Sequence, residues 1–292
     1  IGGRVGFPGF VAEPGHAIRA LDVVVHASTE PEPFGRVIVE AMACAKPVIS
    51  SGVGGAAEIL SLGDLAERFE NGDPWSLAEA MLKLLRSPSR QAELSAHGLQ
   101  LVRERFGRDR LARELPSVYR DILGKASGAL RILHLHSGNM IGGIESALET
   151  FAAFAPTCPE MQQEFALAFD GPLAGRLRSS TSAVHLLPPV QLRNPLSVIR
   201  SRRALLRLLR RRHFDAVISH SPWCQAVYAP AVRAGSTPLL FWMHGAFDGH
   251  WLQKLASRHA PDLAICNSHY TASTLARIYP GLHSEVVRNP VS

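Results

Sequence analysis

Two glutamates, Glu32 and Glu40, stand eight positions apart in the most distinctive stretch of the chain, residues 23–59. A carboxylate can accept hydrogen bonds from two adjacent hydroxyl groups at once, an arrangement that sugars and riboses offer. Gly54 and Gly55 follow in a tight turn before a helix, where unpaired backbone N–H groups and the helix dipole favour an anion, above all a phosphate. Together these residues indicate a ligand that carries both phosphate and neighbouring hydroxyl groups.

The surrounding residues predict the elements that position this chemistry. Two short apolar runs, residues 21–26 and 47–50, suit strands that are buried on both faces of a parallel sheet. Residues 36–44 and 56–60 have apolar side chains at helical spacing. Two helix N-termini then lie at the carboxyl ends of neighbouring strands, which is where an open α/β sheet binds its ligands.

The whole stretch resembles the Glu-x7-Glu signature of retaining family 4 glycosyltransferases, which have the GT-B fold. The resemblance is specific because several short motifs agree in register with the two glutamates. The positions that carry it are Glu32, Phe34, Gly35, Glu40, Lys46, Pro47, Val48, Gly54, Gly55 and Glu58. One position departs from the family, which usually has glycine where this chain has Ala45. If the backbone there is left-handed, alanine costs on the order of 1 kcal/mol of stability.

The resemblance also implies roles for these residues. Glu32 would contact hydroxyl groups of a donor sugar and act in catalysis, and Glu40 would hold the nucleotide ribose. The amides near Phe34 and Gly35 would face the diphosphate, and the Gly54, Gly55 and Glu58 positions would complete the donor site. The plain alternative is two solvated glutamates beside an ordinary sheet, but stray surface charges rarely fall at crevice positions.

Composition describes an ordinary globular protein. The 292 residues are 46% hydrophobic and 19% charged, which is enough chain for two cores. No apolar run approaches the 18 residues of a membrane span, and the start at Ile1, without a signal peptide, suggests a fragment. The cysteines show neither metal nor redox spacing, which favours reduced thiols in the cytoplasm; they are Cys44, Cys158, Cys224 and Cys266.

A polar, glycine-containing segment, residues 124–128, predicts a joint between two domains, 1–125 and 129–292. After the joint, strand and helix patterns alternate as in a complete doubly wound domain. The strands are expected at residues 131–136, 164–169, 183–187, 216–220, 238–243, 263–267 and 285–288. A short strand is also expected at residues 4–10, near the start of the chain.

The two halves resemble opposite ends of the same enzymes. The first half resembles the last part of the carboxy-terminal, donor-side domain, and the second half resembles the amino-terminal, acceptor-side domain, so the order is inverted and the donor domain is truncated. In the family, the missing part carries an arginine and a lysine that neutralise the leaving diphosphate. Arg4 and Lys46 are nearby basic residues, but neither lies in the matching motif. Both a window across two tandem units and a circular permutation fit this order.

Three residues of the second half join the expected site. His244 ends a predicted strand and resembles the family's cleft histidine, which touches the donor sugar, and at a strand's carboxyl end it can donate to a sugar hydroxyl or orient the acceptor. Gly142 and Gly143 resemble the glycine loop, within residues 137–145, whose amides approach the donor phosphates. A core histidine and a plain strand-to-helix turn are the simpler alternatives.

Two further features have weaker functional interpretations. His134 and His136 share one face of a strand, as two zinc ligands would, but no third ligand is evident, so no metal site is expected. Residues 200–212 hold seven arginines, no acid and four interleaved leucines, and residues 129–292 carry 16 basic against 9 acidic residues. This run is either a basic amphipathic helix on anionic lipid or a solvated helix face. Nucleic-acid binding is not expected, because no recognition motif accompanies the charge.

The sequence therefore predicts an α/β protein of GT-B type with two Rossmann-like doubly wound domains, the first incomplete. By resemblance, it would transfer a hexose from a nucleotide sugar of UDP or GDP type, with retention, to a saccharide or lipid-linked acceptor. The donor is a substrate, and neither a cofactor nor a metal is expected. We expect a cytoplasmic location, with peripheral contact at the inner face of the membrane through residues 200–212. A non-catalytic nucleotide-sugar binding or scaffold module, or an inactive fragment of a tandem enzyme, is the alternative.

Overall fold

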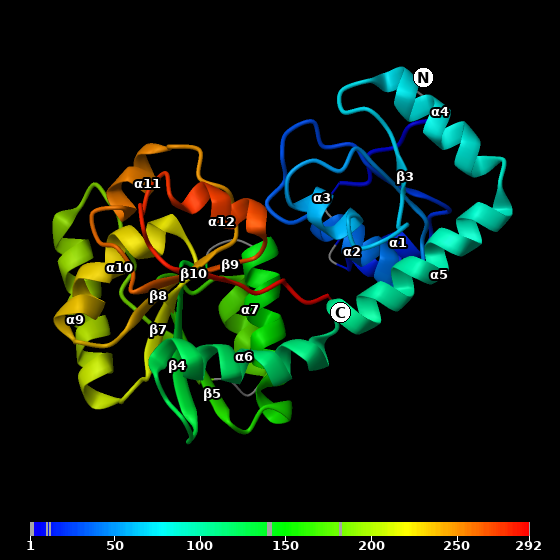
Figure 1. Ribbon diagram of the computed structural model, residues 1–292. Helices are drawn as coiled ribbons and strands as arrows, with labels where there is room; N and C mark the ends of the chain where they lie inside the picture. The colour runs from blue at the N-terminus through cyan, green and yellow to red at the C-terminus, as the bar shows by residue number, and fades with distance from the viewer. Residues whose placement is uncertain (1–2, 10, 12, 139–141, 181–182, 292) are drawn as a thin grey trace. The chain divides into compact units, whose positions relative to one another are not determined.

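The computed structural model describes residues 3–9, 11, 13–138, 142–180 and 183–291 of the chain (Figure 1). The chain divides into two compact units, one made of Ile1–Phe106 with Val291–Ser292 and the other of Gly107–Pro290. Each contains a parallel sheet, and the two are described separately as unit 1 and unit 2.

Unit 1 is built on a three-stranded parallel sheet in the order β1-β2-β3. Its strands are β1 (Val24–His26), β2 (Val48–Ser50) and β3 (Glu67–Arg68). Its helices are α1 (Pro14–Arg19), α2 (Arg36–Ala43), α3 (Gly55–Leu60), α4 (Pro74–Leu85) and α5 (Pro88–Arg105). The apolar runs predicted as strands and helices around the two glutamates are confirmed. Residues 4–9 of the expected first strand form no strand, and Phe10 lies outside the described residues. Gly6 and Pro8 account for this, since proline cannot donate to a ladder.

Close packing of α2 fixes the core of unit 1. The helix buries Ile38, Val39 and Met42. Met42 lies against Gly98 of α5 so closely that a Cβ on Gly98 would lie 2.7 Å from Cγ of Met42. Phe34, at the start of the same segment, packs edge-on against Phe106 with ring centroids 5.9 Å apart. Since α2 begins directly after the loop that carries Glu32, this packing fixes where the loop ends.

Unit 2 contains a seven-stranded parallel sheet in the order β10-β9-β8-β7-β4-β5-β6. From β4 the chain first builds outward through β5 and β6, then returns to β7 on the other side of β4 and continues to β10. This reversal is the topological switch of a doubly wound Rossmann-like sheet. The strands are β4 (Leu130–His136), β5 (Met161–Leu167), β6 (Ala183–Leu186), β7 (Ala216–Ser219), β8 (Leu239–Met243), β9 (Leu263–Cys266) and β10 (Ser284–Val286).

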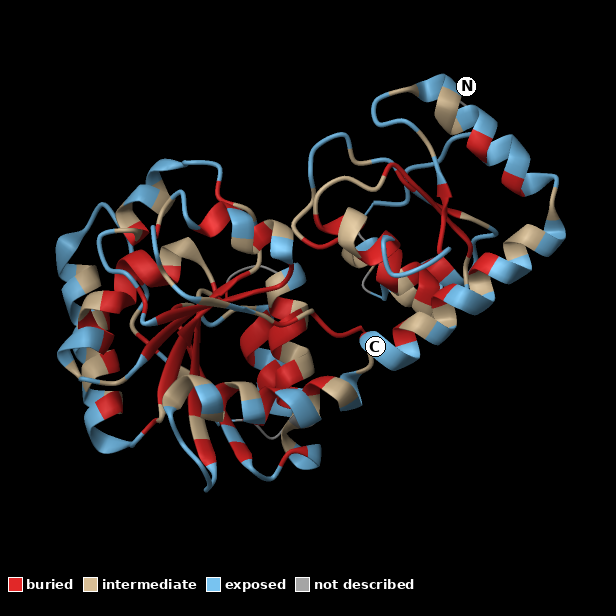
Figure 2. Cartoon of the chain, viewed as in Figure 1, coloured by how far each residue is buried: buried red, intermediate tan, exposed pale blue. Residues whose placement is uncertain are grey.

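Helices cover both faces of this sheet (Figure 1). On one face α6 (Arg108–Leu123), α7 (Gly143–Phe154) and α8 (Pro172–Ser179) pack on Ile132 and its neighbours. On the other, α9 (Pro195–Arg211) and α10 (Pro222–Ala234) pack on Leu133 and Leu135. The remaining elements are the 3-10 helix η1 (Ala155–Thr157) and the helices α11 (Trp251–Ala256) and α12 (His269–Leu275). Figure 2 shows the buried residues concentrated in the strands and on the sides of the helices that face them.

The boundary between the units differs from the predicted joint. The predicted joint, residues 124–128, lies between α6 and β4, whereas the units divide at Phe106 and Gly107. The reason is that Leu111, Leu115 and Tyr119 of α6 belong to the same hydrophobic core as the strands of unit 2. A glycine-containing polar segment predicts a loop, but it does not show whether the preceding helix packs on the first unit or on the second.

Among the described residues, no helix combines the length and the apolar character that crossing a membrane would require.

Candidate functional site

The carboxyl edge of the sheet in unit 1 is closed by two backbone segments lying side by side. Glu32 and Gly54 form an isolated parallel bridge, and the N–H of Gly55 donates to the carbonyl oxygen of Glu32 at 2.6 Å. A Cβ at Gly54 would lie 2.5 Å from that same oxygen, and one at Gly55 would overlap the carbonyl of Pro33. Gly54 is also left-handed, with φ 65°. Only glycine permits this approach, so the glycine turn positions the Glu32 loop, and the Gly55 amide is already occupied by it.

The Glu32 carboxylate is held by two side chains at the end of β1. Nε2 of His26 lies 3.0 Å from Oε2 of Glu32, and the Ser28 hydroxyl donates to Oε1 at 3.0 Å. The hydrogen bond with His26 lowers the pKa of Glu32, burial opposes this, and the electrostatic attraction of His26 and the bond from Ser28 add to the lowering. Glu32 is therefore an ionised hydrogen-bond acceptor at neutral pH.

His26 is itself fixed from the neighbouring strand. It pairs in register with Ser50 of β2, and its Nδ1 lies 3.2 Å from the Ser50 hydroxyl, which also accepts from the N–H of Gly52 at 3.1 Å. With that hydroxyl donating to Nδ1, the proton of His26 is on Nε2, where Glu32 can accept it. The sequence reasoning missed His26, Ser28 and Ser50. A signal was available in the sequence, because His26 and Ser50 are polar residues that end otherwise apolar strands at the edge where such sheets bind ligands.

The other donor-site residues of unit 1 lie around α2 and α3. Glu40 accepts from Nε of Arg36, one turn earlier in α2, at 2.5 Å, and both side chains remain partly exposed. Gly35 caps α2 in a left-handed conformation, φ 88°. The ring of Phe34 is buried in the core of unit 1, so only its backbone can face a ligand. Glu58 lies in the first turn of α3, half-buried.

At the carboxyl edge of unit 2, His244 follows β8 and lies 3.0 Å, through Nε2, from Nδ1 of His220, which follows β7. His134 in β4 lies 2.8 Å from the other nitrogen of His220. His134 and His136 share a face of β4, as expected, but the partner of His136 is Glu145, with Nε2 2.6 Å from its carboxylate. Each of these four histidines therefore has a histidine or a glutamate as a hydrogen-bond partner.

The Glu145 carboxylate also lies at the N-terminus of α7, beside the predicted glycine loop. Burial raises the pKa of Glu145, but the bonds from His136 and from the backbone amides of Glu145 and Gly142 outweigh burial. The pKa is therefore lower than that of an ordinary glutamate, and the group is ionised. Gly142 caps the helix and Gly143 is its first residue. The helix terminus is therefore already neutralised by a side chain of its own. Residues 139–141 of the predicted loop lie outside the described residues.

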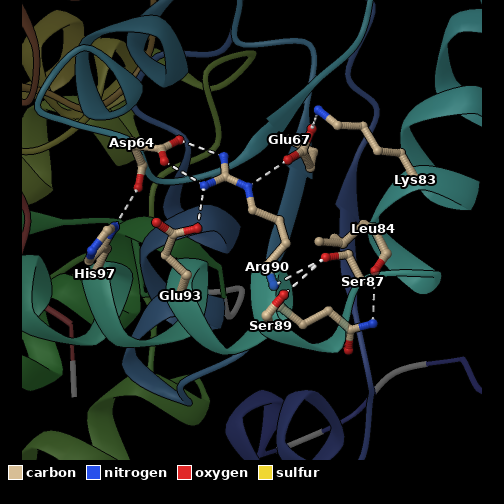
Figure 3. Close-up of polar contacts among 10 residues, drawn as sticks. Asp64, Glu67, Lys83, Leu84, Ser87, Ser89, Arg90, Glu93 and His97 are labelled. Carbon is tan, nitrogen blue, oxygen red and sulfur yellow. Dashed lines mark hydrogen bonds and ion pairs between the residues drawn. The ribbon is translucent and has the colours of Figure 1, made fainter.

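One group of potential metal ligands occurs in the described part of the chain. Asp64, Glu93 and His97 bring one ligand atom each to within 4.8 Å of one another. The guanidinium of Arg90 binds both oxygens of Asp64, at 2.5 and 2.7 Å, and also binds Glu93 and Glu67 (Figure 3). The hydrogen bond from Arg90 lowers the pKa of Asp64, burial opposes this, and the electrostatic attraction of Arg90, His97 and Lys83 adds to the lowering. A cationic side chain already satisfies the carboxylates, so the cluster ties β3 to α5.

The basic run of unit 2 lies on α9, and one side of this helix faces the core of unit 2. Leu205 and Leu209 are buried in the core, and Arg202 donates to the carbonyls of Ala226 and Val227 in α10. Six arginines of the run are partly or fully exposed on the remaining surface: Arg200, Arg203, Arg207, Arg210, Arg211 and Arg212. Leu205 and Leu209 thus belong to the core and Leu208 packs against it, whereas a basic surface remains.

Two family models match the chain. Residues 1–100 match the model described as "Glycosyl transferases group 1", and residues 160–292 match the model described as "Glycosyltransferase Family 4". Together with the two parallel α/β sheets, these matches confirm the fold class expected from the sequence, α/β of GT-B type.

Curated relatives match over part of their length. An N-acetyl-alpha-D-glucosaminyl L-malate synthase of Bacillus anthracis is 32% identical over 95 residues, 32% of this chain and 25% of the relative. A phosphatidyl-myo-inositol mannosyltransferase of Mycobacterium leprae is 31% identical over 126 residues, 42% of this chain and 33% of the relative. A D-inositol 3-phosphate glycosyltransferase of Xylanimonas cellulosilytica is 38% identical over 102 residues, 35% of this chain and 24% of the relative. The chain thus spans a quarter to a third of these relatives.

Solved structures match about half of the chain. Anabaena Alr3699/HepE in complex with UDP and glucose has a TM-score of 0.43 at 20% identity, covering 55% of this chain and 44% of that one. MurG of Acinetobacter baumannii has a TM-score of 0.44 at 15% identity, covering 56% and 46%.

Proposed function

We propose that this chain is part of a glycosyltransferase that moves a hexose from a nucleotide sugar to an acceptor with retention of anomeric configuration. The observation that carries the proposal is the Glu32 carboxylate, held ionised by His26 and Ser28 at the carboxyl edge of a parallel sheet. Two of the relatives named above, a mannosyltransferase and a glycosyltransferase, are sugar transferases by name, and their similarity to this chain supports the same class of reaction.

Unit 1 would bind the donor. Glu32 offers a carboxylate that accepts from the hydroxyls of the sugar, and Glu40 would accept from the ribose while Arg36 orients it. The N-terminus of α2, with Gly35 as its cap, directs backbone N–H groups towards the diphosphate of a UDP or GDP sugar. Gly54 and Gly55 would act by positioning the Glu32 loop, and Glu58 by bordering the same edge from α3.

Unit 2 would contact the acceptor, a saccharide or a lipid-linked saccharide, and His244 would hydrogen-bond a sugar hydroxyl near the point of transfer. Gly142 and Gly143 would let the backbone at the start of α7 approach the ligand closely, while the Gly142 amide stays bound to Glu145. The exposed arginines of α9 would attract anionic phospholipid, which suits a lipid-linked acceptor. Free cysteines throughout the chain fit a reducing compartment, so we place the protein in the cytoplasm, at the inner face of the membrane.

In the proposed reaction the acceptor oxygen attacks the anomeric carbon on the face that the diphosphate leaves. The bond from this carbon to the phosphate oxygen breaks, and that oxygen takes the proton of the acceptor hydroxyl. Stabilisation of the leaving diphosphate supplies much of the rate in such a scheme, through helix N-termini and basic side chains, so we assign neither a metal nor a cofactor.

The inverted order of the halves relative to the family is part of the proposal. Two glycosyltransferase units in tandem would produce this order, and so would a circularly permuted copy that lost part of its sheet.

The test is a transfer assay with radiolabelled UDP and GDP hexoses, carried out on the full-length protein that contains this chain. Transfer that gives a product with the anomeric configuration of the donor, and that is lost in Glu32→Gln, is the expected result. A product of opposite configuration would exclude retention. Nucleotide-sugar binding without any transfer, and with no effect of Glu32→Gln, would instead support the alternative of a non-catalytic binding module.

A further inference from the structure

Four polar side chains form one line of hydrogen bonds across the sheet of unit 2. They lie on four adjacent strands or directly after them, in the order β5, β4, β7 and β8. The side-chain amide oxygen of Gln163, Oε1, is 3.0 Å from Nε2 of His134. Nδ1 of His134 is 2.8 Å from Nε2 of His220, and Nδ1 of His220 is 3.0 Å from Nε2 of His244. We refer to Gln163, His134, His220 and His244 as the histidine relay.

Aromatic neighbours hold the rings of the relay in place. Trp242 stacks on His244 with centroids 5.9 Å apart and an interplanar angle of 8°, and on His220 at 5.8 Å and 23°. His134 stacks on Phe165 at 5.1 Å and 19°. Each ring is attached to a strand or to the residue directly after one, and each is stacked on an aromatic neighbour. The fold therefore fixes which partner each ring nitrogen meets.

The direction of the relay is set at its Gln163 end. Nε2 of Gln163 donates to the backbone carbonyl oxygen of Phe151 at 3.1 Å. A carbonyl oxygen only accepts, so the amide nitrogen must face Phe151 and the amide oxygen must face His134. An oxygen facing Nε2 of His134 requires that this nitrogen carries the proton.

The proton positions then follow ring by ring. Burial lowers the pKa of His134 to about 3, against a smaller opposing effect of Gln163, so the ring is neutral and its Nδ1 accepts from Nε2 of His220. Burial also lowers the pKa of His220 well below its ordinary range, and the neighbouring histidines add to this. His220 is therefore neutral as well, and its Nδ1 accepts from Nε2 of His244.

We propose that Gln163, His134 and His220 are positioning residues that fix a proton on Nε2 of His244 and so hold this imidazole in one tautomer and one ring orientation at the end of β8. The meaning for transfer rests on the function proposed above, whereas the proton positions rest only on the hydrogen bonds of unit 2.

The direct test is nitrogen NMR on the full chain labelled with ¹⁵N-histidine, using long-range proton–nitrogen correlation at about pH 8, above the ordinary imidazole pKa. Single His→Gln variants assign the resonances. The expected spectrum shows Nε2 protonated and Nδ1 unprotonated in His134, His220 and His244. A proton on Nδ1 of His220 or His244 in the unaltered chain would overturn the proposal without recourse to any variant.

A variant pair tests whether Gln163 sets the direction. Gln163→Leu removes the amide, and we expect the His244 signals to become those of a mixture of both tautomers. His185→Gln, which alters a histidine of β6 paired with Glu164 outside the relay, is the matched control and should leave His244 unchanged. An unchanged His244 tautomer in a folded Gln163→Leu chain would show that the relay does not position it. Because the spectra are recorded without substrate, they stand whether or not the transfer assay finds activity.

Discussion

The carbonyl oxygen of Glu32 and the backbone of Gly54 are so close that a single methyl group on Gly54 would lie 2.5 Å from that oxygen. The contact joins the loop that carries the candidate catalytic carboxylate to the turn after β2. Gly54 of the sequence motif is therefore required for a steric reason, the absence of a Cβ beside Glu32. A stability measurement can test this requirement without any assay of activity.

We predict that Gly54→Ala destabilises unit 1 by about 1–3 kcal/mol, because the left-handed backbone and the crowding against Glu32 both disfavour a Cβ. Chemical denaturation followed by far-ultraviolet circular dichroism measures the change. Gly63→Ala is the control, since its nearest neighbour would be a side-chain carbon 3.9 Å away. Equal stability of the two variants would mean that the turn relaxes freely.

Ala45 is left-handed, with φ 53°, at the position where the family usually has glycine. The N–H of Lys46 reaches back to the carbonyl of Ala41 at 2.9 Å and closes α2 there. We expect Ala45→Gly to stabilise the protein by about 1 kcal/mol in thermal or chemical denaturation. Ala78→Gly, at an exposed position inside α4, should destabilise by a similar amount. A loss of stability in Ala45→Gly would contradict the assignment of strain.

His26 should control the protonation of Glu32. The folded-state pKa of Glu32 is lowered, so its bond to His26 contributes stability above the unfolded pKa, about 4.3, that is lost as pH falls through the folded pKa. In His26→Gln the titration midpoint of Glu32, followed by carboxyl ¹³C NMR, should rise towards the ordinary value. His97→Gln, on the exposed side of α5, should leave it unchanged. A midpoint unaffected by His26→Gln would remove His26 from the site.

Glu40→Ala should weaken nucleotide binding by roughly 1–3 kcal/mol, the range for a lost hydrogen bond to a charged group. Calorimetric titration of the full-length protein with UDP and GDP measures the effect. Glu79→Ala, an exposed glutamate of α4, serves as the control for the loss of one negative charge. Unchanged nucleotide affinity in Glu40→Ala would remove the ribose assignment, while leaving Glu32 untouched.

The basic surface of α9 should bind anionic vesicles through charge. We expect Arg203→Glu with Arg207→Glu to abolish co-sedimentation with vesicles that contain phosphatidylserine, and added salt to weaken it in the unaltered protein. Arg103→Glu with Arg105→Glu on α5 matches the change in charge and should have little effect. Binding that survives the α9 changes would assign the arginines to a solvated face.

The sequence alone determined features that depend on neighbours along the chain. Apolar runs predicted β1, β2 and the inner strands of unit 2, because an apolar run of strand length suits a strand buried on both faces of a parallel sheet. The edge strands β6 and β10 were also predicted, although they contain no buried residue. The family resemblance marked position 45 as one where a left-handed residue would close the helix, and the structure has Ala45 in that conformation. The places of Glu32 and Glu40 on a loop and a helix followed from the same local patterns.

Only the tertiary structure decided which side chains meet. His26 and Ser50 are 24 positions apart, and His134 and His220 are 86 apart, so their hydrogen bonds depend on which strands become neighbours and in what register. Whether α6 packs with the first or the second unit, and whether the leucines of α9 face the core, depended equally on surfaces formed by distant segments. Hydrogen bonds act over about 3 Å, so a pattern along the chain can place a side chain at the edge of a sheet but cannot select its partner there.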